Sequence, residues 1–65
     1  NLENIDALAG RGEIYFQRGK IKKGVEDLKR AIELDKEGKH PTSIRARALL
    51  VSLRQEALKR ENENT

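Results

Sequence analysis

The fold is decided by residues 5–35, which read IDALAGRGEIYFQRGKIKKGVEDLKRAIELD. Leu8, Gly12 and Tyr15 are spaced by four and three residues, so they share one stripe of a helix. Gly19 then interrupts the periodicity and is typical of a residue that ends a helix. The second helical period is made by Ile21, Val25, Leu28, Ala31, Ile32 and Leu34. Together these patterns predict two helices that pack as a hairpin.

Gly12 and Gly24 fall in the interiors of the two predicted helices. A glycine there costs about 1 kcal/mol relative to alanine, and a helix usually keeps one where another backbone comes close. We therefore expect the two helices to approach closely at these positions. Gly10 has no such explanation in the pattern: it either lets a ligand approach closely or is tolerated without a role.

The same stretch resembles a single tetratricopeptide repeat (TPR), a helical hairpin of about 34 residues with the pattern W-x2-L-G-x2-Y, A-x3-F and then P. The positions of this pattern fall on Leu8, Arg11, Gly12, Tyr15, Gly24, Leu28 and Lys36. Gly12 and Tyr15 match it, and most other positions keep a residue of similar size. Arg11 departs from it at an apolar position, and Lys36 replaces the proline. The resemblance covers about half of the chain and implies a helical-repeat fold.

The rest of the chain adds one more predicted helix, so we expect an all-α, three-helix fold in which a third helix covers the hairpin. The helices are predicted over about 5–18, 21–36 and 42–60, in a single domain of residues 1–65. Asn4 is the expected N-cap of the first helix. Gly38 is the expected stop of the second helix, and Pro41 lies near the start of the third. Either Thr42 or Ser43 is expected to cap that third helix.

The predicted third helix carries two apolar stripes, because each residue turns the helix by about 100°. One stripe is made by Ala46, Leu50, Leu53 and Ala57, with Leu49 beside it. The other contains Ile44, Val51 and Leu58, spaced by seven residues, with Ala48 nearby. One stripe is enough to cover the hairpin. The second either wraps into the groove between the first two helices or is buried against another chain, which makes its residues candidates for self-association as a homodimer.

The composition limits the classes of protein to consider. A chain of 65 residues forms one small domain with little buried surface, so a partner or a second copy would add stability. There is no cysteine, which excludes disulfides and cysteine-ligated zinc. No apolar run reaches the roughly 18 residues that span a membrane, so we expect a soluble protein, cytoplasmic by default. The net charge of +3 is too small to indicate nucleic-acid binding, although the clustered cations would suit an acidic partner.

The sequence contains no recognisable catalytic arrangement. His40 is the single histidine, and beside Pro41 it is expected on the surface or at a helix cap. Ser43 and Ser52 belong to no nucleophile motif. Residues 10–12, Gly-Arg-Gly, lack the preceding strand and the Gly-Lys-Ser/Thr ending of a phosphate-binding loop. We therefore expect that the chain is not an enzyme and that it binds no cofactor or metal.

The TPR resemblance implies that a partner binds the concave face made mainly by the first helix. Transferred by position, that face carries Asp6, Ala9, Gly10, Glu13, Phe16 and Gln17. Phe16 is the expected apolar anchor, unless it packs under the third helix or a second subunit. TPR co-chaperones hold the tails of heat-shock chaperones with Lys and Asn on this face. Here Ala9 and Glu13 occupy the corresponding places, so that ligand is not expected.

The sequence thus favours a protein–protein interaction module that binds a protein or peptide and either self-associates or belongs to a longer repeat array. A single repeat cannot bury both of its faces, which is the reason for expecting association. The alternative is a designed or excised minimal repeat with a structural role and no ligand. Nucleic-acid binding by the basic clusters is the third and weakest hypothesis, because the clusters lack interleaved aromatic residues.

Overall fold

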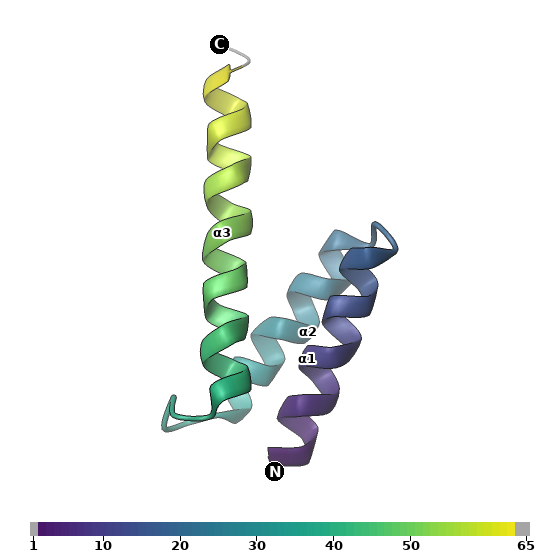
Figure 1. Ribbon diagram of the computed structural model, residues 1–65, viewed down its shortest axis with the longest axis vertical. Helices are drawn as coiled ribbons and strands as arrows, with labels where there is room; N and C mark the ends of the chain where they lie inside the picture. Colours follow the sequence, from purple (N-terminus) through teal and green to yellow (C-terminus); the bar gives the residue numbers. More distant parts are fainter. Residues whose placement is uncertain (1, 64–65) are drawn as a thin grey trace.

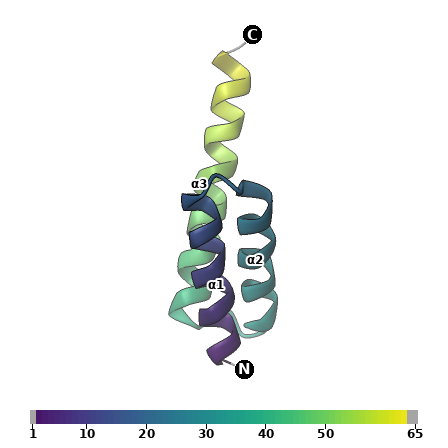
Figure 2. The same cartoon turned by 90° about the vertical axis from the view of Figure 1, so that its right-hand side faces the viewer.

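The computed structural model describes residues 2–63, and within them it contains three helices and no strand. The helices are α1 (Leu2–Gln17), α2 (Ile21–Leu34) and α3 (Pro41–Glu63). α1 and α2 lie antiparallel and side by side, and α3 rises from the loop that follows α2 (Figures 1 and 2). The predicted all-α hairpin with a third helix is confirmed.

The turn between α1 and α2 depends on Gly19. Its φ of 79° lies in the left-handed region, which glycine adopts at little cost. The Lys20 N–H donates to the Tyr15 carbonyl at 2.8 Å, and the Gly19 N–H donates to the Phe16 carbonyl at 3.0 Å. These bonds satisfy carbonyls that the end of a helix leaves without partners. Gly19 therefore ends the first helix, as the sequence predicts.

The two hairpin helices touch through their backbones at Gly12 and Gly24. A Cβ atom added to Gly24 would lie 2.7 Å from Cε1 of Phe16 and 2.8 Å from the carbonyl oxygen of Gly12. One added to Gly12 would lie 3.0 Å from the carbonyl oxygen of Gly24. These distances leave no room for a side chain at either position, so the predicted close approach is confirmed. At Gly10 an added Cβ would meet no atom within 4 Å.

The core is small and lies where the three helices meet near the second loop. Its buried apolar residues are Ile5, Ala9, Leu28, Ala31 and Ala46. Half-buried side chains around them belong to Leu8, Phe16, Ile32, Leu49 and Leu50. Among the described residues of α3, Ala46 and the fully buried Ser43 reach this centre. The third helix is therefore anchored to the hairpin mainly through its first turns.

Beyond these first turns, α3 diverges from the hairpin, and its C-terminal part extends past both other helices (Figures 1 and 2). The residues that α3 directs toward the hairpin are small near the loop, at Ser43 and Ala46, and large farther along, at Leu49, Leu50 and Leu53. Small residues let two helices approach closely, whereas large ones hold the axes apart. The change in side-chain size explains why the two parts of the fold splay open.

Several helix boundaries differ from the predicted ones. α1 begins before Asn4, so the expected N-cap lies inside the helix, and α3 runs past residue 60. α2 ends before residue 35, because the Asp35 N–H bonds to the Ile32 carbonyl in a tight last turn. Gly38 has a φ of 69°, as suits a residue that redirects the chain in this loop.

Neither Thr42 nor Ser43 caps α3, which is a further correction. The helix begins at Pro41, so both hydroxyl residues lie in its first turn. The Ser43 hydroxyl instead donates to the Asp35 carboxylate, and the His40 N–H donates to the same carboxylate at 3.0 Å. The Ser43 bond, with help from the loop N–H groups, lowers the pKa of Asp35. Asp35 thus joins the end of α2 to the start of α3.

The second apolar stripe of α3 faces away from the hairpin. Ile44, Val51 and Leu58 are 52%, 54% and 50% exposed. The first of the two alternatives for this stripe, packing into the groove between the first two helices, is therefore wrong. We call these three residues, together with Ala48, the outer stripe.

Candidate functional site

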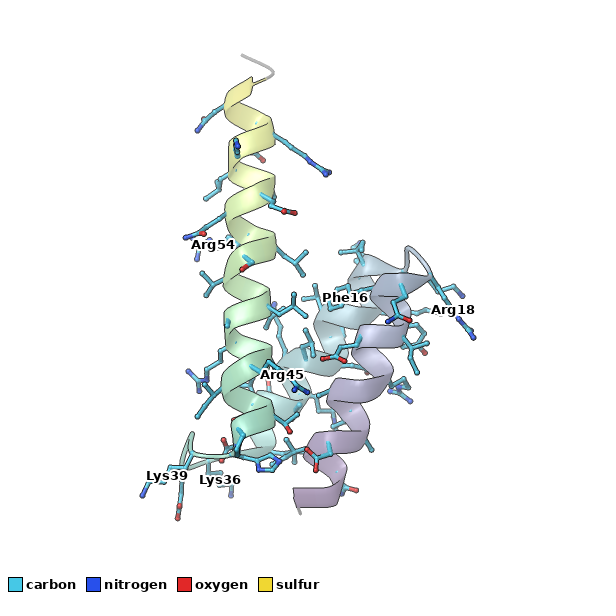
Figure 3. The ribbon with its side chains drawn as sticks, viewed as in Figure 1. Phe16, Arg18, Lys36, Lys39, Arg45 and Arg54 are labelled. Carbon is cyan, nitrogen blue, oxygen red and sulfur yellow. The ribbon has the colours of Figure 1, made fainter. Side chains whose placement is uncertain are left out.

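A groove opens where α3 diverges from the hairpin. Beside α1 the groove contains a hollow with a volume of about 420 Å³. This hollow is lined by Glu13, Phe16, Gln17, Ile21, Leu49 and Leu53. Figure 3 shows Phe16 on the side of the hairpin that faces α3. All three helices therefore contribute to one apolar surface that is open to solvent.

The groove continues around the tip of the hairpin, because Ile21 and Leu53 also line two neighbouring hollows. One of these has a volume of about 270 Å³ and is completed by Glu56, Ala57 and Arg60. The other has a volume of about 460 Å³ and is completed by Val25, Lys29, Leu50 and Arg54. We call the whole surface the interhelical groove; its apolar residues are Phe16, Ile21, Val25, Leu49, Leu50, Leu53 and Ala57.

The two edges of the interhelical groove differ in charge. Glu13 and Gln17 line the α1 side, whereas Lys29 and Arg54 line the α2 side. Oε1 of Glu13 lies 3.9 Å from Nη2 of Arg45, and these side chains are 46% and 72% exposed. An ion pair this long and this exposed contributes little. Glu13 is therefore free to exchange Arg45 for a basic group of a ligand.

Arg11 and Asp27 form the strongest charged contact between α1 and α2. Arg11 Nε donates to Asp27 Oδ2 at 2.7 Å, and Arg11 Nη2 donates to Asp27 Oδ1 at 2.9 Å. The paired hydrogen bonds lower the pKa of Asp27, whose side chain is 10% exposed. The guanidinium also lies 5.9 Å from the centre of the Tyr15 ring. An arginine at an apolar position of the repeat pattern thus has a structural partner.

A second polar cluster ties the beginning of α1 to the start of α3. The Thr42 hydroxyl donates to Oδ1 of Asp6 at 2.5 Å, and Nε2 of His40 lies 3.0 Å from the same oxygen. The Thr42 bond and the His40 contact lower the pKa of Asp6. These residues stabilise the closed end of the fold, so the loop histidine has a structural role at that end.

Residues 5–37 match the family model of the tetratricopeptide repeat, and this span is just over half of the 65 residues. The chain belongs to the tetratricopeptide repeat family. The match covers most of α1, all of α2 and the first part of the loop that follows, and it leaves α3 outside. No match was found among curated proteins or among solved structures. Tetratricopeptide repeats serve in protein–protein interactions, so the family indicates a module of that kind.

The structure divides the six residues that the TPR resemblance assigned to a binding face. Three of them line the interhelical groove: Glu13, Phe16 and Gln17. Asp6 lies at the far end of α1 and is engaged by the second loop. Gly10 is exposed and has open space around it. Ala9, although expected on this face, is only 2% exposed and packs in the core instead.

Sequence reasoning did not predict that Ile21, Leu49 and Leu53 line one groove with Phe16. Leu53 was assigned to the stripe that covers the hairpin, yet it lies too far along α3 to be covered completely. The signal was present in the change from small to large residues along that stripe. The Arg11–Asp27 pair was also missed, although Gly12 and Gly24 set the register that places it. Arg11 directly precedes Gly12, and Asp27 lies one helical turn beyond Gly24.

None of the helices in residues 2–63 is long and apolar enough to cross a lipid bilayer. Within the same residues, no three side chains of His, Cys, Asp or Glu gather as a metal-binding group. Asp6, Asp27 and Asp35 bind hydroxyl, imidazole and guanidinium groups of the chain itself. The polar clusters of the described residues thus hold the fold together, and the exposed apolar surface is the feature to explain.

Proposed function

We propose that this TPR chain is a protein–protein interaction module that holds a peptide segment of a partner in the interhelical groove. The observation that carries the proposal is the groove itself, in which apolar side chains from all three helices remain partly exposed. An open apolar surface of this kind on a small chain is typical of a binding site.

The lining favours a ligand with one large apolar residue next to neutral or basic residues. Phe16, Leu49 and Leu53 offer apolar contacts, while Glu13 and Gln17 lie at the rim of the same hollow. A basic group of the ligand would replace Arg45 beside Glu13 at little cost, since the existing pair is long and exposed. Phe16 also packs over Gly24, so it anchors the hairpin as well as the groove.

The finer part of the proposal is that association with another chain or with neighbouring repeats covers the apolar surface that the fold leaves exposed. Large apolar side chains remain exposed on all three helices: Ile14 at 49%, Ile21 at 48%, Leu34 at 37% and the outer stripe. A single repeat buries too little of this surface alone. The outer-stripe residues Ile44, Val51 and Leu58 are the candidates for contact with another chain.

The test uses two substitutions on opposite faces of α3. A library of short random peptides is panned against the immobilised chain, and the selected peptides are retested with Leu53→Glu and Val51→Glu variants. Leu53→Glu is expected to weaken capture by about tenfold or more, because it places a charge in the apolar groove. Val51→Glu is the matched control on the outer stripe, and it should leave groove ligands unaffected.

Circular dichroism of both variants is the control for folding. A change in capture is attributed to the groove only if each variant retains the helicity of the parent chain. Equal capture by the Leu53→Glu variant would contradict the groove as the binding site. Failure to select any peptide would favour the alternative of a structural repeat without a ligand.

A further inference from the structure

The outer stripe of α3 is a second apolar surface, and the interhelical groove does not use it. Ile44, Val51 and Leu58 follow one another at intervals of seven residues, so they form a line along about 21 Å of helix. Apolar residues repeated at this interval are typical of a seam that packs against another helix. None of the hairpin covers them, since each is about half exposed.

Cations border the outer stripe on both edges. Arg47 and Arg54 each follow a stripe residue by three positions, so they lie along the edge nearer to α2. Lys59 lies along the opposite edge, and all three are exposed. Arg54 thus lies on the edge that the outer stripe shares with the interhelical groove, where it also lines the hollow beside Val25 and Lys29. Glu56 lines the interhelical groove instead. Glu61 follows Leu58 by three positions, so it places a carboxylate at the far end of the edge that carries Arg47 and Arg54. Positive charge therefore outweighs negative charge along the borders of the apolar line.

The loop before α3 adds further charge at the base of that helix. Figure 3 shows Lys36 and Lys39 at this base. Both lysines are exposed, and Glu37 is the acidic residue between them. Two cations against one carboxylate leave this end of the surface positive as well.

We infer that the outer stripe binds an acidic amphipathic helix of another protein. The inference rests on the proposed function as a protein-binding module, but it concerns a different face of α3. Apolar side chains of the partner helix would cover Ile44, Val51 and Leu58, and its carboxylates would meet Arg47 and Arg54 at the edge. Opposite charges at the rim of an apolar contact speed association and select the partner.

A second copy of the chain is the competing occupant, and charge disfavours it. Two α3 helices packed in parallel through the outer stripe would place Arg54 beside Lys59 of the second copy. An antiparallel pair with Ala48 opposite Val51 would place Arg47 beside Arg54 of the second copy. Another apolar hollow open to a second copy is lined by Asn4, Ala7, Leu8, Arg11, Arg30 and Leu34. It also contains two arginines, so these self-contacts bring cations together, whereas an acidic helix meets mostly opposite charge along the same edges.

The experiment measures binding of two synthetic helical peptides that differ only in charge. Both carry leucine at the a and d positions of their heptads, and the e and g positions are glutamate in one peptide and lysine in the other. Fluorescence anisotropy of the labelled peptides should show the glutamate peptide binding about tenfold or more tightly. Its binding should weaken as sodium chloride is raised, because salt screens the pairs at the rim.

Four variants locate the site. Val51→Glu should abolish binding of the glutamate peptide, since it introduces a charge in the middle of the outer stripe. Arg54→Glu should weaken binding about three- to tenfold by replacing attraction at the rim with repulsion. Arg18→Glu carries the same change of charge at an exposed position of the hairpin tip, away from α3, and should have no effect (Figure 3). Leu53→Glu should also leave this peptide bound, which separates the outer stripe from the interhelical groove.

Several results would overturn the inference. Equal affinity for the two peptides, or no binding of either, would exclude an acidic helix as the occupant. A dimer that strengthens with salt and is abolished by Val51→Glu would identify a second copy instead. Binding to vesicles of anionic phospholipid without binding to the glutamate peptide would identify a membrane surface. If the panning experiment selects no groove peptide while the glutamate peptide still binds, the result would contradict the proposed groove alone.

Discussion

The contact between α1 and α2 and the contact of α3 with the hairpin are built from different residues and extend over different lengths of helix. α1 and α2 touch at Gly12 and Gly24, where the backbones come so close that no Cβ fits. Among its described residues, α3 has fully buried ones only in its first turns, at Ser43 and Ala46. Farther along, its leucines hold it away, and the groove opens between them. Side-chain size along one stripe therefore decides where this fold is closed and where it can accept a partner.

A single substitution in the glycine contact between α1 and α2 should have the largest effect. Gly24→Ala is expected to destabilise the chain by about 1–3 kcal/mol, because the new methyl group would overlap the Phe16 ring and the Gly12 carbonyl. Gly10→Ala is the matched control within the hairpin, since an added Cβ there meets nothing within 4 Å. It should stabilise the chain by about 0.5–1 kcal/mol through helix propensity alone. Urea unfolding followed by circular dichroism measures both, and equal effects of the two substitutions would contradict the glycine contact.

Acid should loosen the closed end of α3 by a smaller amount. The pKa of Asp35 is lowered chiefly by the Ser43 hydroxyl, and that of Asp6 chiefly by the Thr42 hydroxyl. A lowered folded-state pKa gives stability that is present above the unfolded value near 3.9 and is lost as the pH falls through the folded value. The melting temperature should therefore decrease between about pH 5 and pH 2.

Asp35→Asn tests the source of this acid sensitivity. The amide oxygen can still accept from Ser43 and His40, so the variant should fold and lose part of the pH dependence. Glu33→Gln, at an exposed position of α2, is the control and should keep the pH dependence of the parent chain. An unchanged acid transition in the Asp35→Asn variant would show that this junction does not carry the effect.

Local spacing predicted the hairpin well, because Gly12, Gly19 and Gly24 each mark a backbone requirement that other residues meet poorly. Helix ends were predicted less well. At the start of α3 the His40 N–H and the Ser43 hydroxyl both donate to Asp35, which belongs to the preceding helix end, and the Thr42 hydroxyl donates to Asp6. Periodicity reports which residues share a face of a helix, but it does not report which residue elsewhere supplies a hydrogen bond.

The candidate site was predicted only in part for a similar reason. The sequence identified Phe16 of the first helix as an apolar anchor. It did not indicate that Leu53 of α3 lines the same groove. Whether a stripe on α3 is covered depends on how far the hairpin extends beside it and on how closely the helices approach. The two stripes could be seen in the sequence; the exposure of Val51 could not.

Hydrogen exchange of individual amides, measured by NMR on the dilute chain, tests the central claim most directly. We expect slow exchange in α1, in α2 and in the first turns of α3, where Ser43 and Ala46 are buried. Amides of α3 beyond Leu53 should exchange much faster, because that part of the helix lacks cover, and they should slow when the glutamate peptide binds. Uniformly slow exchange along the whole of α3 without a partner, unchanged in the Val51→Glu variant, would contradict a third helix that is held at one end and open at the other.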